Sequence, residues 1–204
     1  MFLERQAQKK RKHAKEVAQF LVEVKKKLDP QFLVIAGIDE ELFYQKLSAL
    51  TQKWLGINAP IEDCDGKRLI NNLLIKEINN HYFIAIVADR LDYFIQSFEQ
   101  QNDITQRSLI SWLEVACICG AKKIVCYVLG KIGYNILTQS RNIIPYAVSS
   151  GDVDLAMQMA QLAKILSVTN PGLINLYSFG NFTIVEQINR LFTETPPIHI
   201  KQII

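Results

Sequence analysis

Apolar positions along the first third of the chain follow a helical period. Within residues 14–24 they recur at positions i, i+3, i+4 and i+7 and so fall on one helical face: Val17, Phe20, Leu21 and Val24. A second apolar face follows Asp39, a carboxylate suited to capping a helix; it comprises Leu42, Phe43, Leu47, Leu50 and Leu55. A third predicted helix carries Leu69, Ile70, Leu73, Leu74 and Ile78. The apolar run from Phe32 to Gly37 fits either a strand or a buried helical turn.

From about residue 80 the chain repeats itself. Four segments align with one another, at residues 82–89, 113–120, 144–151 and 173–180. Their last residues are spaced by 31, 31 and 29 positions; these residues are Asp89, Gly120, Gly151 and Gly180. Each is followed by a pair of apolar residues: Tyr93-Phe94, Ile124-Val125, Leu155-Ala156 and Ile184-Val185. One unit is therefore predicted to be a short helix, a tight turn and a second helix.

The residue types at the register positions support this interpretation. Glycine suits a left-handed helix end, which costs a residue with a Cβ atom about 1 kcal/mol. A small residue in the first helix lets paired helices approach closely, and Ala85, Ala116 and Ala147 share that position. Ser108, Asn142 and Asn170 are the predicted N-caps of the first helices.

This order of small residue, closing glycine and apolar pair resembles the ankyrin repeat. The family's usual Thr-Pro-Leu-His opening is absent, and Ser111-Trp112-Leu113-Glu114 stands at its place in one unit. The resemblance implies an all-α fold: an N-terminal helical region over residues 1–79, a solenoid of ankyrin-like helical hairpins over 80–193, and a tail over 194–204. The alternative is an α/β fold in which residues 32–37, 82–88 and 123–129 are buried parallel strands.

Composition excludes several classes of protein. Of the 204 residues, 49% are apolar and 21% are charged, which is typical of a folded chain and not of a disordered one. No apolar run approaches the ~18–20 residues that a membrane span needs, and the N-terminus lacks a secretory pattern. Four cysteines are too few for a disulfide framework. We expect a cytoplasmic protein, or one delivered into a host cytosol, with the nucleus as a further possibility.

Positive charge is concentrated at the N-terminus. Residues 1–27 carry a net charge of +6, whereas the rest of the chain carries −3. A basic patch is formed by Lys9, Lys10, Arg11 and Lys12, within a segment that has the apolar face of residues 14–24. A solvated helix is the plain interpretation; the alternatives are a nuclear-import signal or contact with an anionic membrane. Nucleic-acid binding is disfavoured because aromatic residues do not alternate with the basic ones.

Candidate catalytic and metal-binding patterns are incomplete. Cys117, Cys119 and Cys126 have no fourth ligand nearby, so we expect them to pack as small apolar residues on helices. A calcium-like start at Asp63-Cys64-Asp65-Gly66 lacks the later carboxylate, since Asn72 stands at that position. Cys64 and His81 are the closest thiol and imidazole in the sequence. We predict no catalytic residue, metal or cofactor.

A stack of helix pairs suits a protein partner, bound on an extended concave surface of first helices and turns. Aromatic and arginine side chains dominate such interfaces, and the candidates are Trp112, Tyr134, Arg141, Tyr146 and Tyr177. Ankyrin-like units in a chain rich in Ile, Asn, Gln and Lys are also similar to effectors that intracellular bacteria deliver into host cells. Two alternatives stay open: an enzyme with its catalytic part in residues 30–80, and an adaptor for anionic surfaces through Lys9 to Lys12.

Overall fold

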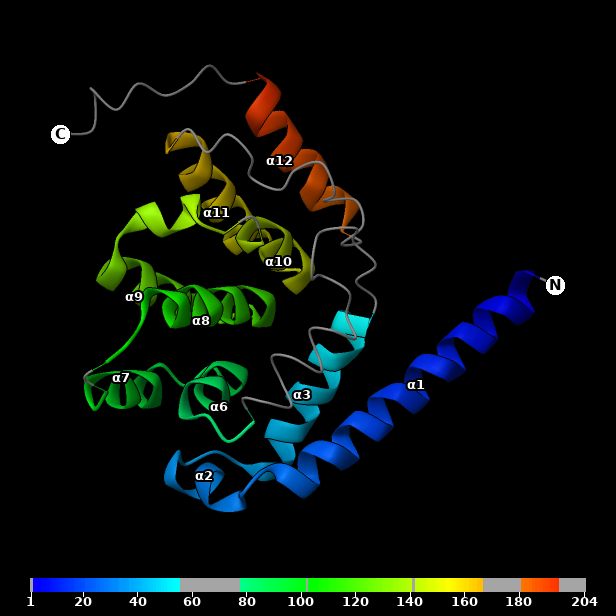
Figure 1. The fold of residues 1–204 in the computed structure, drawn as a ribbon. Coiled ribbons are helices and arrows are strands. Elements are labelled where there is room, and N and C mark those ends of the chain that lie inside the picture. Colours follow the sequence, from blue (N-terminus) through cyan, green and yellow to red (C-terminus); the bar gives the residue numbers. More distant parts are fainter. Residues whose placement is uncertain (1, 56–77, 102, 141, 167–180, 195–204) are drawn as a thin grey trace.

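A computed structural model describes residues 2–55, 78–101, 103–140, 142–166 and 181–194, and every regular element in these ranges is a helix (Figure 1). The N-terminal helices are α1 (Phe2–Lys27), α2 (Pro30–Ile35) and α3 (Glu40–Leu55). The remaining helices are α6 (His81–Ala88), α7 (Leu91–Glu99), α8 (Gln106–Cys119), α9 (Lys122–Ile132), the 3-10 helix η2 (Tyr134–Thr138), α10 (Ile143–Ser150), α11 (Val153–Ile165) and α12 (Phe182–Glu194).

The all-α prediction is confirmed for the described part of the chain. The α/β alternative is wrong there, because its three proposed strands fall in α2, α6 and α9. The ambiguous run of residues 32–37 becomes the short helix α2, since Asp29 caps its first turn and Pro30 opens it. The predicted helix of residues 69–78 lies almost wholly outside the described residues.

Three helical hairpins follow one another along the chain: α6–α7, α8–α9 and α10–α11. Each turns at a residue in the left-handed conformation; these are Asp89 (φ 57°), Gly120 (φ 69°) and Gly151 (φ 78°). The first two turns also close with a backbone hydrogen bond, from Arg90 N to the Ala85 carbonyl and from Ala121 N to the Ala116 carbonyl, both 2.9 Å long. The predicted spacing of 31 residues is therefore the distance along the chain from one hairpin turn to the next. Gly180, the fourth turn position, lies outside the described residues.

The first helices of the hairpins form the centre of the molecule. α8 packs against both α6 and α10, and α11 carries the contact with α12. The small residues predicted for close approach, Ala85, Ala116 and Ala147, are all completely buried. So many side chains of α6 are buried, from Tyr82 to Val87, that this helix presents almost no outer face. The predicted surface of exposed first helices is therefore wrong for α6, and for α10, which is buried in the same way.

Helix α3 lies across one end of α6, α8 and α10, which are the first helices of the three hairpins (Figure 1). The Lys46 ammonium donates to the Ala88 carbonyl at the end of α6 (3.0 Å), and Lys53 donates to the Ser150 carbonyl at the end of α10 (2.8 Å). Cations are favoured at helix C-termini, where unpaired carbonyls carry partial negative charge. Arg90 adds a third tie by donating to the Gly37 carbonyl (2.9 Å) before α3. The N-terminal region therefore braces the hairpins.

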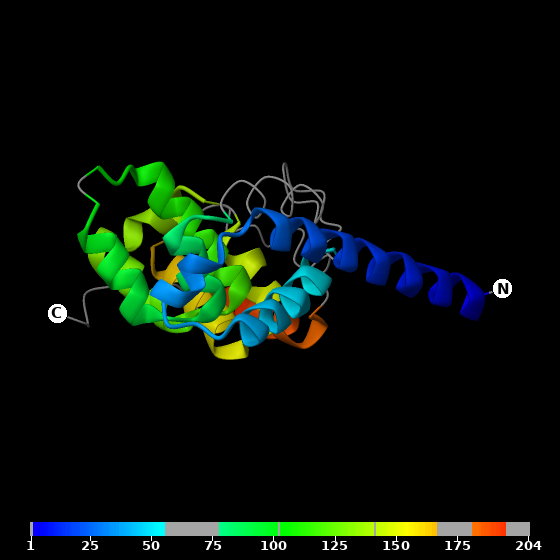
Figure 2. The same cartoon turned by 90° about the horizontal axis from the view of Figure 1, so that it is seen from below.

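Helix α1 packs on α3 with one half and projects from the body with the other (Figure 2). Its predicted apolar face is confirmed, since Val17, Phe20 and Val24 are buried and Leu21 is half-buried. Lys25 of α1 lies over the ring of Tyr44 of α3, 4.7 Å from its centroid. On α3 the predicted Phe43, Leu47 and Leu50 are buried, but Leu42 is 52% exposed, because the Asp39 cap places it in the solvent-facing first turn. The side chain of Leu55 is not described.

One predicted N-cap is wrong, and a second occupies the predicted position without a capping bond. Thr105, not Ser108, caps α8: its Oγ1 accepts a hydrogen bond from Ser108 N at 3.2 Å. Asn142 precedes α10 but makes no side-chain cap bond; its amide instead donates to Glu114 of α8 at 3.5 Å. Asn170 lies outside the described residues.

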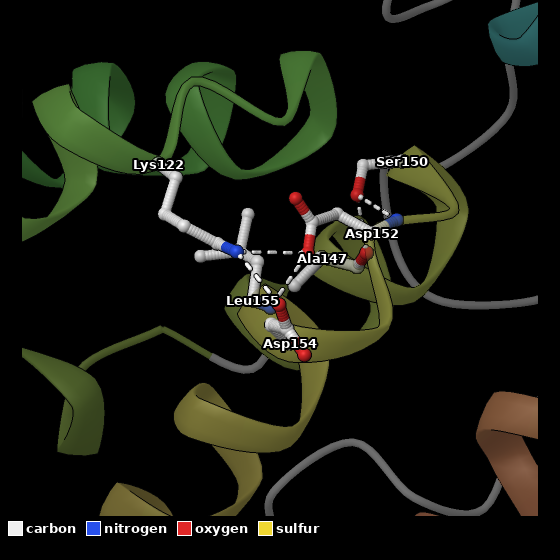
Figure 3. A network of polar contacts seen from close by, with 6 residues as sticks. All are labelled: Lys122, Ala147, Ser150, Asp152, Asp154 and Leu155. Atoms are coloured by element: carbon white, nitrogen blue, oxygen red, sulfur yellow. Dashed lines mark hydrogen bonds and ion pairs between the residues drawn. The ribbon is translucent and has the colours of Figure 1, made fainter.

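A polar network joins the second and third hairpins (Figure 3). Asp152 caps α11, with its Oδ1 accepting from Leu155 N at 2.9 Å. The Lys122 ammonium at the start of α9 lies 3.3 Å from carboxylate oxygens of both Asp152 and Asp154. Ser150 donates to the Ala147 carbonyl and accepts from Asp152 N. One lysine thus ties α9 to the capped start of α11.

Candidate interaction surface

A groove of about 340 Å³ lies between α6, α8 and the segment that leads into α8. Its floor is apolar, because Phe83 and Ile86, one turn apart on α6, line it together with Val115 of α8, and all three are buried. Its wall on α8 is formed by Ser108, Ser111 and Trp112, which share a helical face at spacings of three and four residues. The groove has the size and the mixed lining typical of ligand and peptide sites.

Trp112 is held in place by aromatic contacts. Its ring stacks on Tyr82, with 3.9 Å between centroids and 24° between planes, and meets Phe94 edge-on at 6.3 Å. The Tyr82 hydroxyl is fixed in turn, since it donates to the Ser97 carbonyl at 2.7 Å and lies 2.9 Å from Gln101 Oε1. Trp112 stays half-buried, so part of a rigidly mounted indole faces the groove.

The mouth of the groove is polar. Asn80, which caps α6, and Thr105, which caps α8, both line it. Two exposed charges of opposite sign, Asp103 and Arg107, stand beside these caps. An apolar floor under a polar mouth can bind a hydrophobic side chain while the rim orients the peptide that carries it.

The five predicted contact residues do not lie on one surface of the structure. Trp112 lines the groove, and Tyr134, 50% exposed, lines a second depression of about 270 Å³ between α9 and α11. Tyr146 is only 3% exposed inside α10, so its prediction as a surface contact is wrong; α10 packs on both α8 and α11. Arg141 and Tyr177 lie outside the described residues. In the basic patch Arg11 and Lys12 are exposed, and the side chains of Lys9 and Lys10 are not described.

Sequence reasoning missed most of the groove. Phe83 and Ile86 match the pattern of a buried helix, and nothing in the sequence marks them as the floor of a depression. Helical spacing around Trp112 was the usable signal, because it places Ser108, Ser111 and Val115 on the tryptophan's own face. Asp103 joins the site only because the segment before α8 lies beside α6, whereas Arg107 lies in the first turn of α8, four residues before Ser111.

The described cysteines differ in their surroundings. Cys117 is buried, Cys119 is half-buried and Cys126 is exposed, so the prediction of three packed thiols is confirmed for Cys117 and wrong for Cys126. Burial raises the pKa of the Cys117 thiol, which makes it inert. Within the described ranges, no three His, Cys, Asp or Glu side chains are grouped as metal ligands would be.

The Cys64–His81 combination, which we predict not to be catalytic, is not tested, because Cys64 lies outside the described residues. His81 opens α6, where its Nδ1 hydrogen-bonds the Tyr93 hydroxyl and its ring meets Phe32 edge-on at 4.8 Å. These contacts connect α2, α6 and α7. They give His81 a structural role in the packing of these three helices.

Comparison of the chain with protein-family models, with curated proteins and with solved structures found no match. In the part of the chain that the structure describes, no helix combines the length and the apolar character needed to cross a membrane.

Proposed function

We propose that this protein is an interaction module, a stack of ankyrin-like helical hairpins that binds a protein partner in the groove between α6 and α8. The observation that carries the proposal is the mounting of Trp112 above the buried floor of Phe83 and Ile86. A pocketed aromatic anchor with a polar rim is the usual composition of a binding hot spot. Delivery into a host cell, which the resemblance to bacterial effectors implies, stays a prediction.

Rigid helices favour binding over chemistry at this groove. The turns at Asp89 and Gly120 and the bond from Lys46 to the end of α6 hold the ends of α6 and α8, the two helices that carry most of the lining residues. A preorganised surface loses little conformational entropy when a partner binds. Recognition therefore needs no rearrangement of the hairpins.

A photo-crosslinking amino acid at position 103 tests the proposal. Installed in place of exposed Asp103 at the mouth of the groove, it leaves the floor and the Trp112 wall open and is expected to trap a discrete partner from a lysate, whereas the same group at exposed Lys123 of α9 is not. With the trapped partner purified, Trp112→Ala is expected to weaken binding at least tenfold, about 1.4 kcal/mol.

A second variant separates lost binding from lost folding. Ser111→Trp fills the groove and leaves the Trp112 stack intact, so it is expected to abolish binding while the unfolding midpoint stays near wild type. Lys123→Trp is the matched control on α9. Full affinity in Ser111→Trp contradicts the groove as the binding site.

A further inference from the structure

The face of α1 that points away from the body is a straight polar stripe. Gln8, Lys12, Lys15, Gln19, Val22 and Lys26 are all exposed and follow one another at alternating spacings of four and three residues. They lie opposite the buried Val17, Phe20 and Val24, which pack toward α3. At 1.5 Å per residue the stripe is about 27 Å long.

Positive charge dominates this stripe and its N-terminal half. Arg11, Lys12, Lys15 and Lys26 are exposed on or beside the stripe, whereas Glu16 is half-buried and Glu23 is the one described acid of α1 that is exposed. Asp39, which precedes α3, and Glu40 and Glu41 in its first turn line a groove together with Lys25.

That acidic groove does not cancel the field of the N-terminal half. Lys25, which faces the groove, lies about 20 Å along the helix axis from Lys12. The Debye length at physiological ionic strength is about 8 Å, so the two regions act independently in water. The N-terminal half of α1 also projects beyond the other helices (Figure 2), and a large anionic surface can approach it without meeting the body, whose net charge is −3.

We propose that this outward face of α1 binds an anionic lipid surface through the phosphate and carboxylate groups of its headgroups. A planar membrane meets a straight stripe along its whole length, and Val22, 52% exposed, adds an apolar contact in the same line. Nucleic acid suits the stripe less well, because among the described side chains of α1 no aromatic ring is exposed beside the basic residues to stack on bases. Each lysine near an anionic bilayer strengthens binding by about fivefold, so the attachment is reversible and salt-sensitive.

Co-sedimentation of the full chain with lipid vesicles tests the proposal. The protein is expected to bind phosphatidylcholine vesicles that contain phosphatidylserine at low salt, to leave them at high salt, and to ignore vesicles of phosphatidylcholine alone. Lys12→Glu with Lys15→Glu is expected to reduce binding at least tenfold. Lys123→Glu with Lys131→Glu makes the same change in net charge on α9 and is expected to bind like wild type.

Three results overturn the proposal: no binding of wild type to anionic vesicles, equal losses in the two double variants, or tighter binding to an RNA or DNA oligonucleotide at the same salt. Circular dichroism confirms that both variants keep their helices. The proposal goes beyond the interaction groove, and the two fail separately, because Ser111→Trp fills the groove and leaves vesicle binding unchanged.

Discussion

Asp89, Gly120 and Gly151 share one register position and one backbone conformation but not one residue type. A positive φ costs little for glycine and about 1 kcal/mol for a residue with a Cβ atom. Asp89 is the one non-glycine residue with positive φ in the described ranges. The turn of the first hairpin therefore carries backbone strain at Asp89, whereas the next two hairpins turn at glycines without that strain.

Exchanging the residue types across this register is expected to have opposite effects on stability. Gly120→Ala lowers the free energy of unfolding by about 1 kcal/mol through backbone strain alone, since an added Cβ would meet Ser150 at an ordinary 3.6 Å. Asp89→Gly raises it by about 0.5 kcal/mol, because relief of strain is partly offset by a more flexible unfolded chain. Urea unfolding measures both, and stabilisation by Gly120→Ala contradicts the left-handed turn.

Glu114 is a residue whose protonation affects folding. Its half-buried carboxylate accepts hydrogen bonds from Ser140 and Asn142, but burial outweighs them and raises the pKa of the Glu114 carboxyl above its ordinary value of 4.5. The folded state thus holds this proton more tightly than the unfolded state does. Its contribution to stability is full below pH 4.5 and is lost as the pH rises through the folded-state pKa.

Glu114→Gln is expected to remove this pH dependence. The glutamine stays neutral and can still accept from Ser140, so the variant should be more stable than wild type at pH 7 and should lose that advantage near pH 4. Urea midpoints at the two pH values measure the difference. A variant that is less stable than wild type at pH 7 would show that the charged carboxylate stabilises the fold.

Among the helices, the features that the sequence predicted correctly are those that depend on residues close together in the chain. The apolar face of α1, the Asp39 cap, the three hairpin turns and the buried alanines all follow from helical periodicity and backbone conformation. The position of α3 across the ends of α6 and α10 does not, because it depends on contacts up to 97 residues apart. For the same reason the sequence predicted Trp112 as a contact residue but did not predict that Phe83 and Ile86, on another helix, form the floor of its groove.

The two lysines of α3 are expected to hold the hairpin ends independently. Replacing Lys46 or Lys53 with methionine keeps the aliphatic stem and removes the charged donor, at a cost of about 1 kcal/mol each. Amide hydrogen exchange should quicken at the end of α6 in Lys46→Met and at the end of α10 in Lys53→Met. Lys123→Met, in an exposed position on α9, is the control. Unchanged exchange at both ends contradicts the bracing role.

At the scale of the whole molecule, burial determines where a partner can bind. Because α6 and α10 are almost completely buried, the accessible surfaces are the groove beside Trp112, the outer helices and the projecting half of α1. The basic helix and the groove lie in separate parts of the chain. The two proposed surfaces lie on α1 and on α6 and α8, so we expect occupation of one to leave the other free.

Successive blocks of 31 residues in this protein are pairs of α-helices joined at left-handed turns. Backbone NMR assignment of the full chain measures this directly through Cα secondary chemical shifts. We expect helical shifts on both sides of residues 89, 120 and 151, with a positive φ at each of these three residues. Strand-like shifts from Ile124 to Leu129, where α9 lies, would contradict the helical stack and the groove built on it.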